Sequence, residues 1–517
     1  MSTPDTAPAG EAGPKTAMQR ILDTVERVGN KVPHPVMIFV YLIVFVVLLS
    51  ALLSLLGAQV TYQTYNPATG DIEQATTAAR SLLTIDGIRF MFTGVVPNFM
   101  GFNAVGVIIV AMVGVGVAEE AGLVKALIRK LVIVAPPKAL TYILVFVGIV
   151  SSIAADAGYL VLIPLAAAAF LSVGRHPLAG LAMAFAAVAS AFMVNVLIVP
   201  VDGILTEITN DAARLVNPNV SIDLAANVWF SIASVAMLTL LIAVITERVI
   251  EPRLGPYKGD YQVPGENVLS EAEYKGLRAA RLALFGVLGF IGLLLLPPGA
   301  PLRNPETGAI IGSSPFMASL IVSIALIFLV CGIAYGRAAG TMRTAADAIA
   351  AIQKSIGSLA GLILLLLVIS QFIAIFNYSN MATLAAVSMA EFLQKLNLPT
   401  VALLIGFVIA VFGIDLIITA AIAKWAIFAP VFVPLLMQLG VAPEVVLAAY
   451  RVGDSPMNSI TPLNAYFAMI VTFAIKYQKD AGVGTVIALM LPYVIAIAVV
   501  WTAMLAAWYM LGLPWGL

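Results

Sequence analysis

Long apolar runs alternate with short polar stretches along almost the whole chain. A run of about 18 or more apolar residues is long enough for a helix to cross a ~30 Å hydrocarbon core. The pattern predicts nine full membrane crossings, over residues 36–57, 99–118, 177–209, 226–246, 282–297, 315–335, 356–377, 443–475 and 484–512. The sequence lacks the short segments of alternating hydrophobicity that are typical of a membrane β-barrel. We therefore expect an all-α polytopic membrane protein.

Two further apolar segments, 139–174 and 400–440, are too long for a single crossing. Small or polar residues interrupt the first at 150–158 and the second at 412–425. Each segment could be two crossings or one re-entrant helical hairpin. Both arrangements return the chain to the side from which it started, so the distribution of charge does not separate them.

Each of these segments is followed by a crossing, 177–209 or 443–475, that is itself interrupted by proline. Pro200 precedes Asp202 by two residues, as Pro462 precedes Asn464. Proline frees backbone carbonyls, which cannot stay unsatisfied in lipid. Such breaks persist where they bind a ligand or line a cavity, and a proline kink packed by neighbouring helices is the alternative. Because the two units start from opposite sides, we predict an inverted-topology repeat with its breaks meeting near the midplane.

The positive charges divide unequally between the two sides of the predicted membrane. With the N-terminus inside, 20 Lys and Arg residues fall on the inside and 5 on the outside. This bias predicts a cytoplasmic N-terminus and a C-terminus outside. The resulting parts are a disordered or amphipathic cytoplasmic N-terminus (1–35), a first transmembrane half (36–246), a cytoplasmic linker (247–281) and a second transmembrane half (282–517).

Composition supports the membrane class and excludes others. Apolar residues make up 61% of the 517 residues and charged residues only 10%, against roughly 25% charged in soluble domains. Basic and acidic residues number 27 each, so no net charge favours nucleic acid. Cys331 is the sole cysteine and cannot form an internal disulfide. No Walker A sequence is present, which argues against ATP-driven transport; we expect no cofactor, with Na⁺ as one candidate coupling ion.

Charged residues inside the apolar segments concentrate in the two repeat units, namely Asp156, Asp202, Asp415, Lys424, Arg451 and Asp454. An ionised group in the membrane is costly, so these side chains should face a cavity or one another. Arg451 and Asp454 are three residues apart, a spacing that permits an ion pair on one helix. The interpretation that we favour makes Arg451 an anchor for a substrate carboxylate, because a guanidinium binds a carboxylate through two donors.

Asp202 lies in an unwound stretch with no basic residue nearby in the sequence, so it is a candidate cation ligand or proton carrier; a solvated helix end is the alternative. Asp156 and Asp415 could be ligands or exposed hairpin tips. Trp425 could stack on an aromatic substrate, but we favour a position at the membrane interface, where tryptophan is enriched. The complete set of candidate cation-binding residues is Ser151, Ser152, Asp156, Asn195, Asp202, Asp415, Asp454, Thr461 and Asn464, and Asn458 adds another neutral oxygen.

Three stretches resemble the AbgT family, the p-aminobenzoyl-glutamate transporters: Ser151 to Tyr159, Val199 to Gly203, and Tyr450 to Asn464. The resemblance implies a homodimer in the bacterial inner membrane, in contact with lipid. It also implies nine crossings and two re-entrant hairpins per protomer. The implied fold is similar to that of the ion-transporter superfamily, which includes divalent-anion/Na⁺ symporters.

The resemblance implies folate fragments such as p-aminobenzoyl-glutamate as substrates, and export of sulfonamide antimetabolites by some members. Carried onto this chain, the functional aspartate is Asp202, and the proline and arginine of the late broken helix are Pro443 and Arg451. The substrate-binding candidates are then Asp202, Pro443, Arg451, Asn458, Pro462 and Trp425.

The predicted function is therefore secondary transport of an aromatic carboxylate, driven by Na⁺ or protons, and not enzymatic catalysis. A Na⁺-coupled dicarboxylate symporter is the alternative. An intramembrane aspartyl protease is more remote, because Arg451 stands where the first glycine of its Gly-x-Gly-Asp motif is needed. An ion channel is disfavoured because the proline-broken repeat argues for alternating access. The transport direction is not encoded in any residue.

Overall fold

The computed structural model describes residues 33, 35–65, 72–134, 136, 139–153, 158–259, 269–311, 314–395, 398–416, 418–461, 463–464 and 466–517. The N-terminal tail predicted over residues 1–35 falls almost wholly outside this part of the chain. Two of the candidate site residues, Asp156 and Pro462, also lie outside the described residues.

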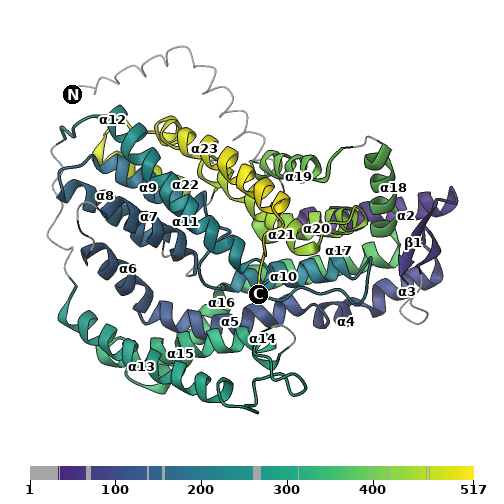
Figure 1. The fold of residues 1–517 in the computed structure, drawn as a ribbon, viewed down its shortest axis with the longest axis horizontal. Helices are drawn as coiled ribbons and strands as arrows, with labels where there is room; N and C mark the ends of the chain where they lie inside the picture. Colours follow the sequence, from purple (N-terminus) through teal and green to yellow (C-terminus); the bar gives the residue numbers. More distant parts are fainter. Residues whose placement is uncertain are drawn as a thin grey trace, which may run out of the picture.

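Within the described residues, eight helices are long and apolar enough to cross a membrane (Figure 1). Many of their outward-facing side chains are apolar, as on the first of them, where Phe45 and Leu48 are exposed. These helices confirm a multi-pass, helical membrane protein. They are α2 (Pro35–Leu55), α5 (Asn103–Glu120), α11 (Val228–Ile245), α13 (Glu271–Leu295), α15 (Leu320–Ala339), α17 (Ala360–Tyr378), α20 (Ala421–Gln438) and α23 (Val483–Met510).

Shorter helices, together with the long α20, occupy the two units in which the sequence predicts interruptions. The first unit contains α7 (Leu140–Val150), α8 (Ile163–Ser172), α9 (Pro177–Ala189) and α10 (Pro200–Ala213). The second contains α19 (Thr400–Asp415), α20, α21 (Pro443–Asp454) and α22 (Phe467–Tyr477). Proline begins α9, α10 and α21, where its missing N–H leaves no hydrogen bond unmade. The predicted breaks inside 177–209 and 443–475 are therefore present.

In the stretch predicted as a linker, 247–281, most of the residues that the structure describes are helical. Helix α11 continues through a π-helical turn, Thr246–Ile250, into α12 (Glu251–Leu254). It stops at Gly255, whose φ of +66° suits glycine. Helix α13 begins after Ser270, whose hydroxyl accepts a hydrogen bond from the N–H of Glu273. Charged residues in 247–281 mark the end of the apolar stretch, but they do not end the helices.

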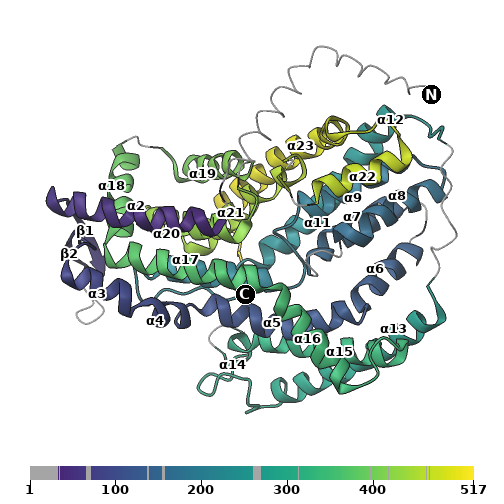
Figure 2. The same ribbon diagram turned by 180° about the vertical axis from the view of Figure 1, so that it is seen from behind.

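Most of the remaining elements were not predicted from the sequence; the exceptions overlap the starts of the predicted crossings 99–118, 315–335 and 356–377. Strands β1 (Gln59–Tyr65) and β2 (Ile72–Ala78) form an antiparallel hairpin beside α18 (Met381–Lys395). The short helices are α3 (Ile85–Thr93), α4 (Val95–Met100), α6 (Leu123–Val134), α14 (Pro315–Ala318) and α16 (Ala345–Ser358). Figure 2 shows β1, β2 and α3 together at one end of the molecule, far from α12 and α22.

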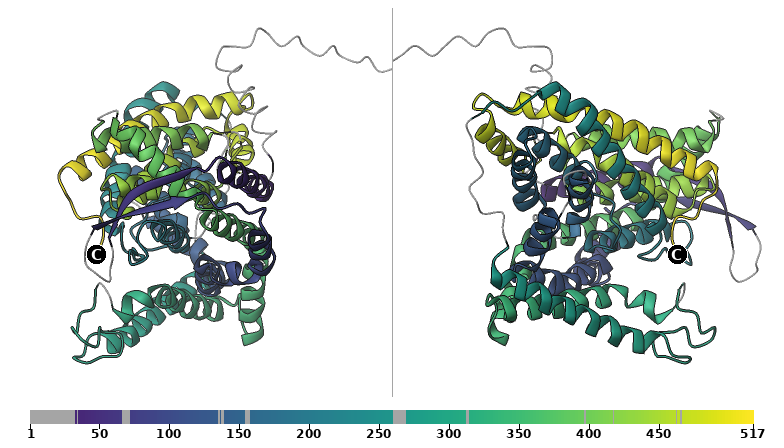
Figure 3. Two further views of the ribbon diagram at one scale, coloured as in Figure 1. Left: turned by 90° about the vertical axis from the view of Figure 1, so that its right-hand side faces the viewer. Right: turned by 60° about the vertical axis from the view of Figure 1, so that its left-hand side comes forward.

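Helix α15 packs against both α5 and α13 along one side, and Figure 3 shows α13 and α15, in teal and green, at the lower edge of the molecule. Two glycines bring α5 and α15 unusually close. A Cβ atom on Gly114 would lie 1.9 Å from the Ala325 carbonyl oxygen, and one on Gly332 would lie 2.8 Å from the Ala118 backbone. Small residues allow such close backbone approach between membrane helices.

An ion-pair cluster connects the turn between α8 and α9 to the end of α11. The Arg175 guanidinium donates to both carboxylate oxygens of Glu251, at 2.7 and 2.6 Å, and to the hydroxyl of Thr141 at 2.7 Å. The same hydroxyl donates to Glu247 at 2.7 Å. This cluster links α7, the α8–α9 turn, the π-helical turn Thr246–Ile250 and α12. Helices α10, α20 and α21 lie at the centre of the molecule (Figure 1).

Candidate functional site

The two broken helices are in direct contact where their helical structure is interrupted. We call residues 190–199 the first break and residues 455–466 the second break. The hydroxyls of Ser190 and Ser459 lie 2.7 Å apart, and the N–H of Met193 donates to the Ser455 hydroxyl at 3.3 Å. These four residues are buried. The centre of the protein is therefore built from the interrupted backbone of both units, in which Pro456–Ser459 forms a short 3₁₀ helix.

Each break also bonds to the interruption of its own preceding hairpin segment. In the first unit the Asn195 amide donates to the carbonyl of Val150 at 3.1 Å and to the Ser152 hydroxyl at 2.9 Å. In the second, the Thr461 hydroxyl donates to the carbonyl of Leu416 at 3.2 Å. Both accepting carbonyls lie where the first helix of the segment ends. Side chains thus satisfy carbonyls that the interrupted helices leave free.

Each break also contains an asparagine whose side chain holds a local turn. The Asn195 side-chain oxygen accepts the N–H of Leu197 at 3.1 Å, and the Asn464 oxygen accepts the N–H of Tyr466 at 3.0 Å. Both are hydrogen bonds to the backbone two residues on, which hold a local turn. In this conformation these predicted cation ligands are therefore engaged with the backbone of their own breaks.

Arg451 pairs with Asp202 across the two units, at 2.6 Å. The pairing of Arg451 with Asp454 that the sequence permitted is wrong, because the guanidinium extends from α21 toward α10 and away from Asp454. Its other bonds go to the Met193 carbonyl at 2.9 Å and the Asn227 side chain at 3.2 Å. The Asp202 side chain is 13% exposed, so it is not a solvated helix end. Its second oxygen caps α10 by accepting the N–H of Val199 at 2.8 Å.

Asp415, Lys424 and Asp454 form a second group of charges, which we call the buried triad. The Lys424 ammonium donates to Asp415 and lies 2.7 Å from Asp454 Oδ1. All three side chains are fully buried, so the alternative of an exposed tip for Asp415 is wrong. The reason is that α19 ends and α20 begins deep in the protein, where a buried ammonium needs a carboxylate beside it.

Trp425 lies in the protein interior, so the favoured interpretation of a membrane-interface residue is wrong. Its indole N–H lies 3.0 Å from the Thr209 hydroxyl and 3.2 Å from the Leu205 carbonyl, both on α10. Its ring stacks on Tyr450, with 4.5 Å between centroids. The indole connects α20, α21 and α10, and its polar N–H finds partners inside the bundle.

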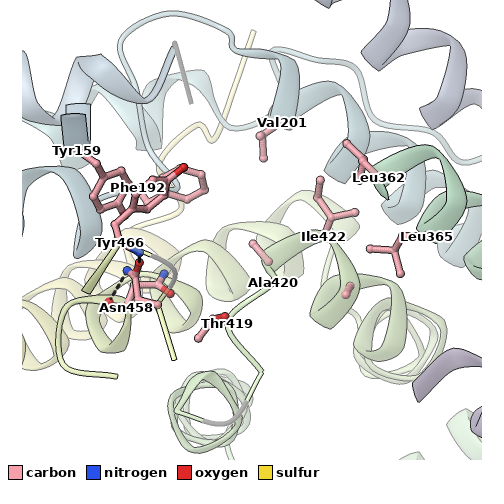
Figure 4. A pocket seen from close by; sticks show the side chains of 13 residues that line it. Tyr159, Phe192, Val201, Leu362, Leu365, Thr419, Ala420, Ile422, Asn458 and Tyr466 are labelled. Atoms are coloured by element: carbon pink, nitrogen blue, oxygen red, sulfur yellow. Dashed lines mark hydrogen bonds between the residues drawn. The ribbon is translucent and has the colours of Figure 1, made fainter. Parts of the chain in front are cut away.

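A cavity of about 320 Å³ lies between the two units (Figure 4). Pockets that hold drug-sized ligands measure roughly 300–1,000 Å³. Tyr159 and Tyr466, one from each unit, stack at one end of the cavity with ring centroids 4.2 Å apart. The lining residues are Tyr159, Phe192, Val201, Leu362, Leu365, Thr419, Ala420, Ala421, Ile422, Ala423, Asn458, Asn464 and Tyr466. The cavity is mostly apolar, with amide and hydroxyl groups on its second-unit side.

The predicted site residues are only partly brought to this cavity. Asn458 and Asn464 line it, and the Asn464 amide donates to the Asn458 carbonyl at 2.8 Å. Asp202 follows the lining residue Val201, and Trp425 is two residues beyond the lining residue Ala423, but neither lines the cavity. Pro443 begins α21 and is buried. Ser151 and Ser152 donate to backbone carbonyls three residues earlier, at 2.6 and 3.0 Å.

Three aromatic residues were missed as site residues: Tyr159, Phe192 and Tyr466. Lys424 was named among the charged residues expected to face a cavity or one another, but not as a site residue. A lysine in an apolar run, nine residues after an aspartate, was a usable signal for the triad. The aromatic residues flank the breaks, but aromatic residues are common in apolar segments. Nothing in their sequence context distinguished them.

Comparisons with known proteins agree with this architecture. A family model described as "AbgT putative transporter family" matches residues 20–517. The chain is 35% identical over 492 residues to a p-aminobenzoyl-glutamate transport protein of Escherichia coli K12, covering 95% of each chain.

Two solved structures match closely. The YdaH transporter of Alcanivorax borkumensis shares 42% identity and a TM-score of 0.88, covering 94% of this chain and 100% of that one. MtrF of Neisseria gonorrhoeae, described within a class of antimetabolite efflux pumps, shares 40% identity and the same TM-score, with coverages of 95% and 97%. With a family match over nearly its whole length and relatives of this similarity, the chain belongs to the AbgT family of transporters.

Proposed function

We propose that this protein is a cation-coupled secondary transporter of aromatic carboxylates, namely p-aminobenzoyl-glutamate-like folate fragments or sulfonamide antimetabolites. The cavity between the two units carries the proposal. Its size suits a small aromatic molecule, Phe192 and two stacked tyrosines supply ring surfaces, and Asn458 and Asn464 supply polar groups. The named activities of the relatives, p-aminobenzoyl-glutamate transport and antimetabolite efflux, fall in the same chemical class.

Arg451 is proposed to bind the substrate carboxylate by exchanging partners. In this conformation it holds Asp202, whose neighbour Val201 lines the cavity. A substrate carboxylate offers the same two acceptor oxygens as Asp202, so it can replace that residue at the guanidinium. Such an exchange would release Asp202 to a cation, either Na⁺ or a proton. Pro443, which begins the helix that carries Arg451, contributes by fixing the start of that helix.

The same proposal includes nine crossings, two re-entrant hairpins and an inverted repeat, with the N-terminus in the cytoplasm of a bacterium and a homodimeric assembly. The matching pattern of bonds supports the repeat: in each unit a polar side chain of the break bonds to a carbonyl at the end of the first hairpin helix. Cysteine substitutions at Ser152 and Thr419 would test the hairpins. An impermeant thiol reagent should reach the two positions from opposite sides of the membrane.

Exchange of labelled p-aminobenzoyl-glutamate across proteoliposomes, without any gradient, tests the transport function directly. We expect unlabelled sulfonamide to compete and succinate to leave exchange unchanged. Phe192→Ala should weaken competition because it removes a ring from the cavity wall. Phe285→Ala is the matched control, since that ring is exposed on α13. Exchange of succinate in place of the aromatic substrate would favour the dicarboxylate symporter instead.

A further inference from the structure

The buried triad contains one negative charge more than its positive charge balances. It has two carboxyl groups, Asp415 and Asp454, and a single ammonium, Lys424. Within the part of the chain that the structure describes, no other charged side chain lies at ion-pair distance from these three. An uncompensated charge in a fully buried site is expensive, so a neutral form of one carboxyl group is strongly favoured.

The hydrogen bonds of Tyr450 point independently to an additional proton. Its hydroxyl oxygen lies 2.8 Å from Asp454 Oδ1 and 2.5 Å from the Ala421 carbonyl oxygen. A hydroxyl has one hydrogen, so it cannot donate fully to both acceptors. If Asp454 is protonated, its carboxyl group donates to the Tyr450 oxygen, while Tyr450 donates to the carbonyl of Ala421. Every short contact then has a hydrogen.

Two further atoms of the triad are unsatisfied. Among the described residues, Oδ2 of Asp415 and Oδ2 of Asp454 have no hydrogen-bond partner, and both are buried. A carboxylate normally accepts several bonds, so bare oxygens on both groups are unfavourable when both are ionised. A protonated carboxyl group carries less charge and tolerates a bare oxygen better. Charge and hydrogen bonding therefore lead to the same count of one proton.

The other titratable side chains on the helices packed against the triad do not face it. Asp202 and Asp211 form ion pairs with Arg451 and Arg214. Glu207 and Tyr493 form hydrogen bonds with Asn103 and Thr246, and the Tyr378 ring stacks on Phe90. The others lie toward the ends of their helices: Glu391, Lys395, Glu444 and Tyr509. Tyr450 is thus the single additional titratable group among the described residues that contacts the triad.

We infer that the buried triad holds one exchangeable proton, carried by Asp454, and that this proton is the coupling ion of the proposed transport. The assignment rests on the proposed function, and it makes the coupling site distinct from Asp202. It names Asp415, Lys424 and Tyr450 as residues that position and compensate the proton.

The triad is connected to the cavity by two hydrogen bonds. The Asn458 amide donates to the backbone carbonyl of Asp454 at 2.8 Å, and Asn458 lines the cavity. Tyr450 bonds to the carbonyl of Ala421, which also lines it. Without the proton, Asp454 would accept a hydrogen bond from Tyr450 instead of donating one to it. The bond between Tyr450 and Ala421 would then weaken, which links the state of the proton to the cavity wall.

Asp415→Asn tests the inference because it leaves one ammonium and one carboxylate, a neutral pair with no need for a further proton. The test uses proteoliposomes without Na⁺ and a pH gradient of one unit. If one proton is coupled to one substrate, the ratio of labelled p-aminobenzoyl-glutamate concentrations across the membrane should reach up to about ten. Asp415→Asn should bring that ratio to about one, while gradient-free exchange continues. Asp86→Asn, an exposed carboxyl group on α3, should behave as the unaltered protein.

Infrared spectroscopy supplies a readout that needs no transport and that can be taken on the unaltered protein alone. The unaltered protein in detergent should show the carbonyl stretch of a buried protonated carboxyl group, which disappears at high pH; Asp415→Asn should lack that band. Absence of the band from the unaltered protein, or full pH-driven accumulation by Asp415→Asn, overturns the inference. If the unaltered protein exchanges no aromatic carboxylate at all, the proposed function fails. The infrared band still shows whether the buried triad holds a proton.

Discussion

The bond between Arg451 and Asp202 is the charged link between the two units, and replacing Asp202 shows what it contributes. Asp202→Asn keeps the shape and one oxygen but removes the charge opposite Arg451. Because the remaining oxygen can still accept the N–H of Val199, which Asp202 bonds at 2.8 Å, this substitution isolates the ion pair. Asp202→Ala removes both the charge and the cap of α10.

The expected loss of unfolding free energy follows from how deeply the two side chains are buried. The Arg451 side chain is 4% exposed and that of Asp202 13%. Removing one partner of a buried ion pair lowers the free energy of unfolding by about 3–5 kcal/mol. Because Asp202 is partly accessible, we expect a loss of about 3 kcal/mol for Asp202→Asn. Loss of a helix cap adds about 1 kcal/mol, which gives about 4 kcal/mol for Asp202→Ala.

Equilibrium unfolding in mixed detergent micelles would measure these costs within a double-mutant cycle. The cycle combines Asp202→Asn with Arg451→Met, and we expect the double variant to be less destabilised than the sum of the singles by about 2 kcal/mol. Purely additive costs would refute a stabilising pair. Equal stability of Asp202→Asn and Asp202→Ala would refute the capping role while leaving the pair intact.

Three further predictions concern other parts of the fold. Gly114→Ala should cost at least about 2 kcal/mol in the same unfolding assay, since its Cβ would lie 1.9 Å from a backbone oxygen of α15; Gly106→Ala, in open space on the same helix, should cost nothing. Trp425→Phe should keep the stack on α21 but lose the indole donor, at a cost of about 1 kcal/mol. Two backbone N–H groups, of Thr344 and Arg343, hold the pKa of Asp347 below its usual value of 3.8. The stabilisation of α16 by this cap is therefore fully present above pH 3.8 and is lost as the pH falls through the lower pKa of the folded state. Helical content measured by circular dichroism should fall in that pH range. Asp347→Asn should remove this pH dependence.

Interruptions of helices could be predicted from the sequence, because proline and runs of small or polar residues act locally. Pro200 and Pro443 begin helices where the apolar pattern also breaks. The ends of apolar runs were a poorer guide to helix ends. The helix that contains Arg248 continues past the apolar stretch to Leu254, because a charged side chain at a membrane boundary does not disfavour helix.

Partners of the charged residues could not be predicted, because they depend on how distant helices rotate against one another. Arg451 lies 249 residues from Asp202 in sequence, and the nearer Asp454 belongs to Lys424 instead. Local spacing allowed both arrangements. For Trp425 the general enrichment of tryptophan at interfaces pointed outward, whereas packing against α10 and α21 places it in the core.

The stacked rings of Tyr159 and Tyr466 have a consequence for how the cavity can be filled. Their centroids are 4.2 Å apart and their planes differ by 14°, so each ring already covers a face of the other. A planar guest that slid between them would gain two ring contacts and remove one, and it would force the two units apart by about the thickness of a ring. Such a guest would act as a wedge, so that binding of a flat molecule would displace one unit of the protein against the other.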